Sequence, residues 1–221
     1  EFMEDALAAS DARVIDCSEG VELLENLSHE HSEGEDDHDH GHYDPHIWMS
    51  VDNAMVMVEN LCNGLEETDE AYVEIYRNNF QKAMEELNSC RETLNTIRTE
   101  PTISSVYGVG LVTFHNGFQY FANAYDLTLL ESIEEEAGSE ASAKEINEIT
   151  ELVREYHIPM IFPELNGSAA TAQAIARETG CQVAQLSMLM DGEGTDLTAY
   201  CDGLIQNMQT VMDGFRLENR T

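Results

Sequence analysis

Six of the eight histidines lie in one eighteen-residue stretch, residues 29–46, where they are interleaved with Asp and Glu. Imidazole nitrogens and carboxylate oxygens at this density are the ligands that a borderline divalent cation such as zinc prefers. The stretch therefore predicts contact with a metal ion, although a solvated acidic loop without any metal role has a similar composition. The last of the six, His46, differs from the others because it lies in the aromatic and apolar motif YDPHIWM.

The composition fits one large domain or two lobes and disfavours nucleic acid as a partner. The chain has 221 residues, of which 42% are hydrophobic, and domains usually contain about 100 to 200 residues. A formal net charge of -34 repels phosphate backbones and anionic lipid surfaces. No apolar run approaches the roughly 18 residues that span a bilayer, and no export signal opens the chain. The first residues instead predict a helix over 2–8 and a strand over 13–17, so we expect the chain to begin inside a domain.

The cysteines are scattered and contain no CxxC pair that would indicate a structural zinc site or a redox motif. The five positions are Cys17, Cys62, Cys90, Cys181 and Cys201. Cys62 and Cys90 fall within helical patterns and are expected to be small buried side chains.

Two helices are predicted after the histidine-rich stretch. Apolar residues recur at helical spacing over 51–65, with Asp52 or Asn53 near the start of that helix. From Thr68, about thirty residues without Gly or Pro carry one apolar stripe, which predicts a helix roughly 45 Å long. So long a helix in so small a protein is expected to connect two lobes. A coiled-coil arm is the alternative, and it is disfavoured because the apolar spacing is not strictly heptad.

From residue 102 onward the pattern alternates strand and helix, which implies parallel pairing and right-handed crossovers. The expected strands cover 103–107, 128–130, 160–162 and 183–186, and the expected helices cover 116–124, 143–156, 168–179 and 196–215. Ser168 is the predicted N-cap and Gly180 the predicted C-cap of the third of these helices. The second half of the chain is therefore predicted to be an α/β lobe.

His115 is the histidine of interest in this second half. Ligands of open α/β sheets gather beyond the carboxyl ends of the strands. That rule selects three loops: the one that ends in GLVTFHNGF, the one after Leu130 with the acidic residues Glu131, Glu134, Glu135 and Glu136, and the one that contains Glu164. His115 lies at an expected helix start between two phenylalanines, which limit solvent and hold the imidazole in place. A lone histidine of this kind is more often structural than a ligand, because a metal centre needs several convergent ligands.

Three sequence features follow one another in order: DPHIW with the helix NAMVMVENL, a long helix, and FHNGFQYFANAYDLT. With these features the chain resembles the metal-binding solute-binding proteins of ABC transporters, the cluster that captures zinc or manganese outside the cell. The resemblance implies an α/β, two-lobed fold with a long rigid connecting helix, in which the N-terminal part of the first lobe is missing. The implied domains are a partial N-terminal α/β lobe over 1–66 with a histidine- and acid-rich loop at 29–42, a linking helix over 67–99, and a C-terminal α/β lobe over 100–221.

Two histidines match the metal ligands of the zinc-type members. The histidine of DPHIW is His46, and the histidine that opens FHNGFQYF is His115. The second one implies zinc rather than manganese, because the manganese members tend to have a carboxylate there. The family contributes another histidine from an N-terminal segment that this chain does not contain, so the expected site is short of one ligand. Asp191 is the carboxylate nearest to the position where some members supply an aspartate, and a solvated loop acid is the alternative for it.

The resemblance implies capture of zinc outside the cytoplasm and its delivery to the membrane permease of an ABC transporter. His46 and His115 would close on one zinc ion, and a monomer in the periplasm or a lipoprotein at the cell surface is expected, with the export signal outside this chain. Because the ligands must be unprotonated, zinc affinity should fall below about pH 6.5. The loop is expected to collect zinc weakly through its five histidines, which are His29, His31, His38, His40 and His42.

Two other functions stay open at this point. One is a metal-binding adhesin or interaction module that keeps the fold without a transport role. The other is a zinc hydrolase with Glu164 as the base, which is disfavoured because the sequence contains no HExxH motif. Zinc titration of His46→Ala and His115→Ala variants would distinguish capture from both.

Overall fold

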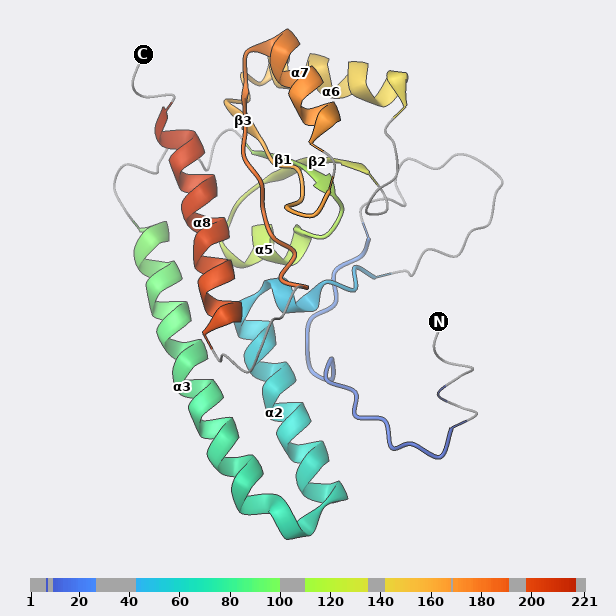
Figure 1. Cartoon of the computed structure of the whole chain (residues 1–221), viewed down its shortest axis with the longest axis vertical. Coiled ribbons are helices and arrows are strands. Elements are labelled where there is room, and N and C mark those ends of the chain that lie inside the picture. Colours follow the sequence, from blue (N-terminus) through green and yellow to red (C-terminus); the bar gives the residue numbers. More distant parts are fainter. Residues whose placement is uncertain are drawn as a thin grey trace.

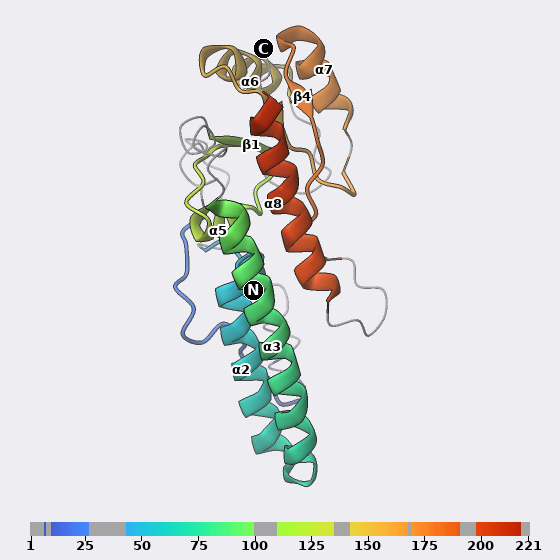
Figure 2. The same ribbon diagram turned by 90° about the vertical axis from the view of Figure 1, so that its left-hand side faces the viewer.

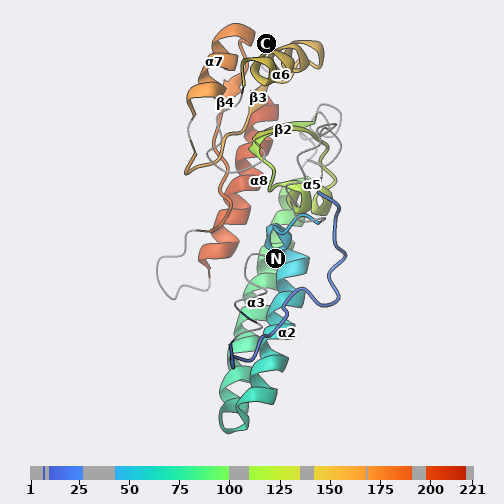
Figure 3. The same cartoon turned by 90° about the vertical axis from the view of Figure 1, so that its right-hand side faces the viewer.

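A helical hairpin forms one end of the molecule, and a small parallel sheet with its covering helices forms the other (Figures 1 and 3). The computed structural model describes residues 7, 10–26, 43–99, 110–134, 142–167, 169–190 and 198–217. The described elements, in chain order, are a 3-10 helix at Ile47–Met49, α2 (Val51–Thr68), a 3-10 helix at Glu70–Tyr72, α3 (Val73–Arg98), β1 (Leu111–His115), α5 (Gln119–Ala124), β2 (Leu129–Glu134), α6 (Ala143–Glu155), β3 (Met160–Ile161), α7 (Ala170–Thr179), β4 (Gln182–Val183) and α8 (Ala199–Leu217). No described helix is both long and apolar enough to cross a membrane.

Helix α2 begins at a side-chain cap and ends at a break that shortens the predicted long helix. The Ser50 side chain accepts a hydrogen bond from the backbone N–H of Asn53, so Ser50 is the N-cap. Asp52 lies in the first turn as expected, where a negative charge suits the helix dipole. Asp69 leaves the helical conformation, with φ -140°, and the chain reverses there. The long helix expected from Thr68 therefore starts at Val73, as α3.

Helix α3 is buried along its second half only. Leu87, Cys90, Leu94 and Ile97 are all buried there, and α8 packs beside this part of the helix (Figure 2). Ile75, in the first turn, is 52% exposed, because α2 is the one described α-helix that packs beside α3 at that end of the molecule. The apolar stripe predicted along this helix thus extends into its first half, where the described part of the chain does not cover it.

The strands form parallel pairs, as the alternation of strands and helices predicted. β1 pairs with β2, and β3 pairs with β4, both in parallel. A parallel bridge between Thr113 and Phe162 joins the two pairs, so β1 lies beside the strand that contains β3. Gly180 has φ 82° and closes α7 as the expected C-cap.

Side chains of β1 and β3 alternate between two hydrophobic cores, as side chains of a strand must. Val112 and Ile161 pack into a cluster with α6 and α7. Leu111 and Met160 point to the opposite side, into the larger cluster that contains the buried face of α8. The sheet is therefore covered on both faces, which holds the carboxyl ends of its strands in place.

Several predicted elements differ from the structure. Residues 13–17 form no strand; this segment lies beside α2, where the Ile15 side chain lies against Gly64 and the Asn60 amide donates to the Cys17 carbonyl. The strand predicted over 103–107 and the N-cap Ser168 lie outside the described residues, and so does the helix over 2–8 apart from Leu7.

The most consequential correction concerns the segment that contains His115. The sequence predicted a loop up to this histidine and a helix from residue 116, but strand β1 covers Leu111–His115 and helix α5 starts at Gln119. His115 is therefore the last residue of a buried strand, which fixes its direction more firmly than a helix start would. The proposed division into three domains stays a prediction.

Candidate metal centre

His46 is held in place by its own sequence neighbours. The carboxylate Oδ1 of Asp44 accepts one hydrogen bond from the backbone N–H of His46 at 2.8 Å and one from ring Nδ1 at 2.6 Å. The Asp44 backbone N–H in turn donates to the carbonyl of Leu24, and the Asp44 side chain is only 1% exposed. Pro45 separates the two residues and restricts the chain between them. The sequence D-P-H thus builds a local clamp on one imidazole.

This clamp determines which nitrogen of His46 is available. An ionised carboxylate only accepts hydrogen bonds, so Nδ1 of His46 carries the proton and Nε2 presents a lone pair. A carboxylate behind the ring nitrogen that does not face the metal is the usual arrangement at metal-binding histidines, because it fixes the tautomer and raises the basicity of the ligand.

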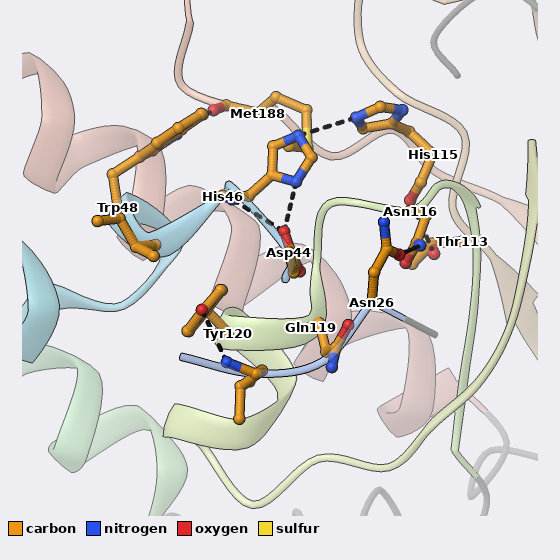
Figure 4. A network of polar contacts seen from close by, with 12 residues as sticks. Asn26, Asp44, His46, Trp48, Thr113, His115, Asn116, Gln119, Tyr120 and Met188 are labelled. Carbon is orange, nitrogen blue, oxygen red and sulfur yellow. Dashed lines mark hydrogen bonds and ion pairs between the residues drawn. The ribbon is translucent and has the colours of Figure 1, made fainter. Parts of the chain in front are cut away.

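His115 brings a second imidazole to the same point from the end of β1. Figure 4 shows the two rings facing each other, with Nε2 of His115 3.2 Å from Nε2 of His46. The ring planes are nearly perpendicular, at 88°. A zinc ion about 2.05 Å from each nitrogen, in tetrahedral geometry, would hold the two nitrogens about 3.3 Å apart. The two nitrogens therefore already have the spacing of a zinc chelate.

The surroundings of His115 favour its neutral form. Burial lowers the pKa of His115, the neighbouring His46 lowers it further, and Asp44 opposes both effects. An unprotonated imidazole at neutral pH is the form that coordinates zinc. Nδ1 of His115 is buried and has no hydrogen-bond partner among the described residues.

Glycine at position 117 leaves room for this arrangement. A side-chain carbon there would lie 2.8 Å from Cδ2 of His115 and would also collide with the Met188 side chain. Met188 is 2% exposed, so it forms an apolar wall beside the imidazole. Any larger residue at position 117 must displace both of these side chains.

Contacts between distant parts of the chain hold the His46 segment against the sheet. The Trp48 indole N–H donates to the Met188 carbonyl at 2.9 Å, and the Tyr200 hydroxyl, on α8, donates to the Trp48 carbonyl at 2.6 Å (Figure 4 shows the first contact). The ring of Trp48 also meets the His46 ring edge-on, with centroids 5.4 Å apart. These contacts join the segment before α2 to the loop after β4. They therefore hold His46 at a fixed position relative to His115.

The structure brings together His46 and His115, the two histidines that the sequence selected. Asp191 lies outside the described residues, and so do the five loop histidines His29, His31, His38, His40 and His42. Within the described ranges, no group of three or more His, Cys, Asp and Glu side chains is placed to hold a metal, so Glu164 does not complete a site with the histidine pair. Asp44 was not among the predicted site residues, although the spacing of Asp and His in DPH is a visible sign of its contact with His46.

Comparison with protein families gives one match over nearly the whole chain. The family model described as zinc-uptake complex component A, periplasmic, matches residues 1–214. The iron-binding protein YfeA of Yersinia pestis is 28% identical over 177 residues, which are 77% of this chain and 55% of that protein. The zinc-binding protein AdcA of Streptococcus pyogenes is 30% identical over 187 residues, which are 83% of this chain and 35% of that protein. The chain thus spans about half the length of these curated relatives, or less.

A solved structure supports the same relationship in three dimensions. The crystal structure of ZnuA superposes with a TM-score of 0.74 at 25% sequence identity, over 96% of this chain and 73% of that one. The match extends over the helical hairpin and the sheet together, so the chain has the fold of these metal-binding solute-binding proteins.

Proposed function

The chain belongs to the family of zinc-uptake complex component A, periplasmic proteins, and on that basis we propose that it captures zinc outside the cytoplasm for an ABC transporter. The observation that carries the proposal is the pair of Nε2 atoms 3.2 Å apart, one of which has its lone pair directed by Asp44. Binding and release of the ion is the function of such a site, and the permease of the transporter is the proposed recipient.

The proposed ligands are His46 and His115, which occupy two of the four positions that zinc prefers. Asp191 is proposed for a third position, and water or a side chain outside the described residues for the fourth. Relatives carry names for iron as well as zinc, so the metal must be argued from the donors. Two neutral imidazoles favour zinc over manganese, which prefers carboxylate and carbonyl oxygen.

The histidine-rich loop is proposed as an accessory collector of zinc. Its five histidines alternate with carboxylates, so each equivalent of zinc would bind weakly and exchange fast. Location in the periplasm or at the cell surface and a monomeric state belong to the same proposal. The hydrolase alternative lacks a structural argument, because Glu164 joins no metal-binding group within the described residues.

A zinc titration in competition with a chelator tests the proposal. His46→Ala and His115→Ala should each weaken the tight site by more than about 100-fold, since removal of a partner outside the coordination shell alone typically costs 10- to 100-fold. His157→Asn is the matched control: His157 is exposed at the end of α6 with φ 50°, a conformation that Asn tolerates. Tight binding that survives both alanine variants would refute the assignment.

Deletion of residues 30–42 separates the loop from the histidine pair. The deletion should remove weak zinc equivalents and leave the tight one unchanged. Loss of the tight site in the deletion variant, with the histidine pair intact, would instead make the loop the primary site.

A further inference from the structure

Two cysteines that the metal centre does not use face each other between α3 and α8. Cys90 lies on the buried half of α3, and Cys201 lies in the first turn of α8. The two helices pack side by side in perpendicular views (Figures 1 and 2). Cys90 is 2% exposed and Cys201 is 3% exposed. The burial of each position requires only a small apolar residue. Burial therefore does not explain why two thiols lie opposite each other.

Each of the two sulfur atoms lies against the backbone of the opposite helix. Sγ of Cys90 lies 3.9 Å from the carbonyl oxygen of Cys201, and Sγ of Cys201 lies 3.8 Å from the carbonyl oxygen of Glu86. Glu86 is one helical turn before Cys90, and its carbonyl points toward the Cys90 amide. Each sulfur therefore reaches the opposite helix at the level of the other cysteine. Interaction between the two thiol groups raises the pKa of Cys90 and lowers the pKa of Cys201.

The other described cysteines have different surroundings. Cys62 contacts Glu66 on its own helix, and Cys181 follows α7. A metal role for the facing pair is disfavoured because no third ligand joins it in the described part of the chain. We propose that Cys90 and Cys201 form an intramolecular disulfide that ties α3 to α8 when the chain folds in the presence of a disulfide oxidant. This inference concerns a covalent site that the zinc proposal neither requires nor predicts.

The chemistry is a pair of thiol–disulfide exchanges with glutathione disulfide as the oxidant. The Cys201 thiolate attacks one sulfur of glutathione disulfide, a mixed disulfide forms, and one glutathione thiolate leaves. Cys90 loses its proton to that thiolate and attacks the Cys201 sulfur of the mixed disulfide, which releases the second glutathione. The two cysteines lose two protons and two electrons, and one glutathione disulfide becomes two glutathione molecules. Because both thiols are buried, the exchange occurs during folding or a local opening of the two helices.

The cross-link joins positions 111 residues apart and so restricts the unfolded chain strongly. It also anchors the start of α8, where Tyr200 donates to the carbonyls of Trp48 and Ser50 beside the metal-binding segment. We therefore expect the oxidised chain to unfold at a temperature roughly 5 to 15 °C higher than the reduced chain.

Disulfide mapping on the unmodified sequence is the direct test. The purified, reduced chain is equilibrated with glutathione redox buffers at a mild denaturant concentration that permits local opening. Free thiols are then alkylated, and the digested chain is examined by mass spectrometry without reduction. The expected result is a linked peptide pair that contains Cys90 and Cys201, an intact mass lower by two hydrogens, and a melting temperature that returns to the lower value after reduction.

Variants show whether the stabilisation comes from this pair. Cys90→Ser and Cys201→Ser should each abolish the oxidant-dependent rise in melting temperature, and Cys62→Ser, on α2, should retain it. The proposal is overturned if the unmodified chain keeps alkylated Cys90 and Cys201 under all oxidant ratios, or if either pairs with another cysteine. The mapping does not depend on whether the serine variants fold.

Discussion

Asp44→Asn tests the clamp on His46 with the smallest possible change of shape. The carboxylate accepts two hydrogen bonds through Oδ1, from the ring and from the backbone of His46, while buried from solvent. The amide loses the negative charge and can also donate to Nδ1, which would place the proton of His46 on Nε2, the atom that faces His115. Zinc binding must then reverse that tautomer before Nε2 can coordinate the ion.

The expected loss of zinc affinity is about 10- to 100-fold, the usual effect of removing a partner behind a ligand. That range corresponds to about 1.4 to 2.7 kcal/mol, at about 1.36 kcal/mol for each factor of ten. The value agrees with the net worth of a hydrogen bond to a charged group, about 1.5 to 3 kcal/mol. The usual loss of metal affinity and the usual hydrogen-bond energy thus give the same magnitude.

A chelator-competition titration measures this loss, and denaturant unfolding of the metal-free chain separates it from a loss of stability. The separation matters because Oδ2 of Asp44 is buried without a partner among the described residues, so an amide nitrogen there would be an unsatisfied donor. Asp126→Asn is the control, since Asp126 is exposed, pairs with Arg98 and has φ 55°. Affinity of Asp44→Asn within about twofold of the unchanged chain would refute the role of the clamp.

Three further predictions follow from the same geometry. The pKa of His115 is lowered on folding, so the unfolded chain takes up that proton first as the solution is acidified. Stability of the metal-free chain should therefore fall as pH drops below about 6.5, by at most about 1.4 kcal/mol per pH unit. Denaturant unfolding at a series of pH values measures this loss of stability. Gly117→Ala should weaken zinc binding and lower the melting temperature, because the added carbon meets His115 and Met188. Tyr200→Phe should cost about 1 kcal/mol of unfolding free energy, by loss of the hydrogen bond to the Trp48 carbonyl, and should weaken zinc binding less than Asp44→Asn does.

Each of these predictions has an outcome that contradicts it. A stability that rises as the solution is acidified through pH 6 would mean that His115 gains its proton more easily in the folded chain. Unchanged zinc affinity in Gly117→Ala would show that the ring of His115 moves freely at no cost. A loss in Tyr200→Phe as large as in Asp44→Asn would place the main restraint on His46 in α8.

The parallel strand–helix pattern was predictable from the residues, because alternation of strands and helices specifies parallel pairing. The meeting of His46 with His115 was expected from the family resemblance, since the residues around His115 alone do not distinguish a ligand from a structural histidine. Strand β1 was missed because the strand was predicted at 103–107 and the residues between it and the expected helix at 116 were assigned to a loop. Gly110 adopts φ 84°, but the buried run after it pairs with β2. A short apolar run does not identify its partner strand.

Other features depend on contacts that are remote in sequence. The segment 13–17 has the residue types of a strand, yet a strand needs a neighbour with free hydrogen-bonding groups, and α2 offers a packing surface instead. Trp48 and Tyr200 are 152 positions apart, and the facing of Cys90 with Cys201 spans 111 positions. Local periodicity carries no information about such pairs. Asp44 is different, because its contact with His46 is local and the sequence DPH already indicates it.

The most direct test of the central claim is a crystal structure of the chain with zinc, in which anomalous scattering at the zinc edge locates the ion. The account predicts one strong zinc peak between His46 and His115, about 2.0 to 2.1 Å from each Nε2 atom, with Nδ1 of His46 still bonded to Asp44. A fully occupied zinc site elsewhere, with the two Nε2 atoms in direct contact and no ion between them, would contradict it.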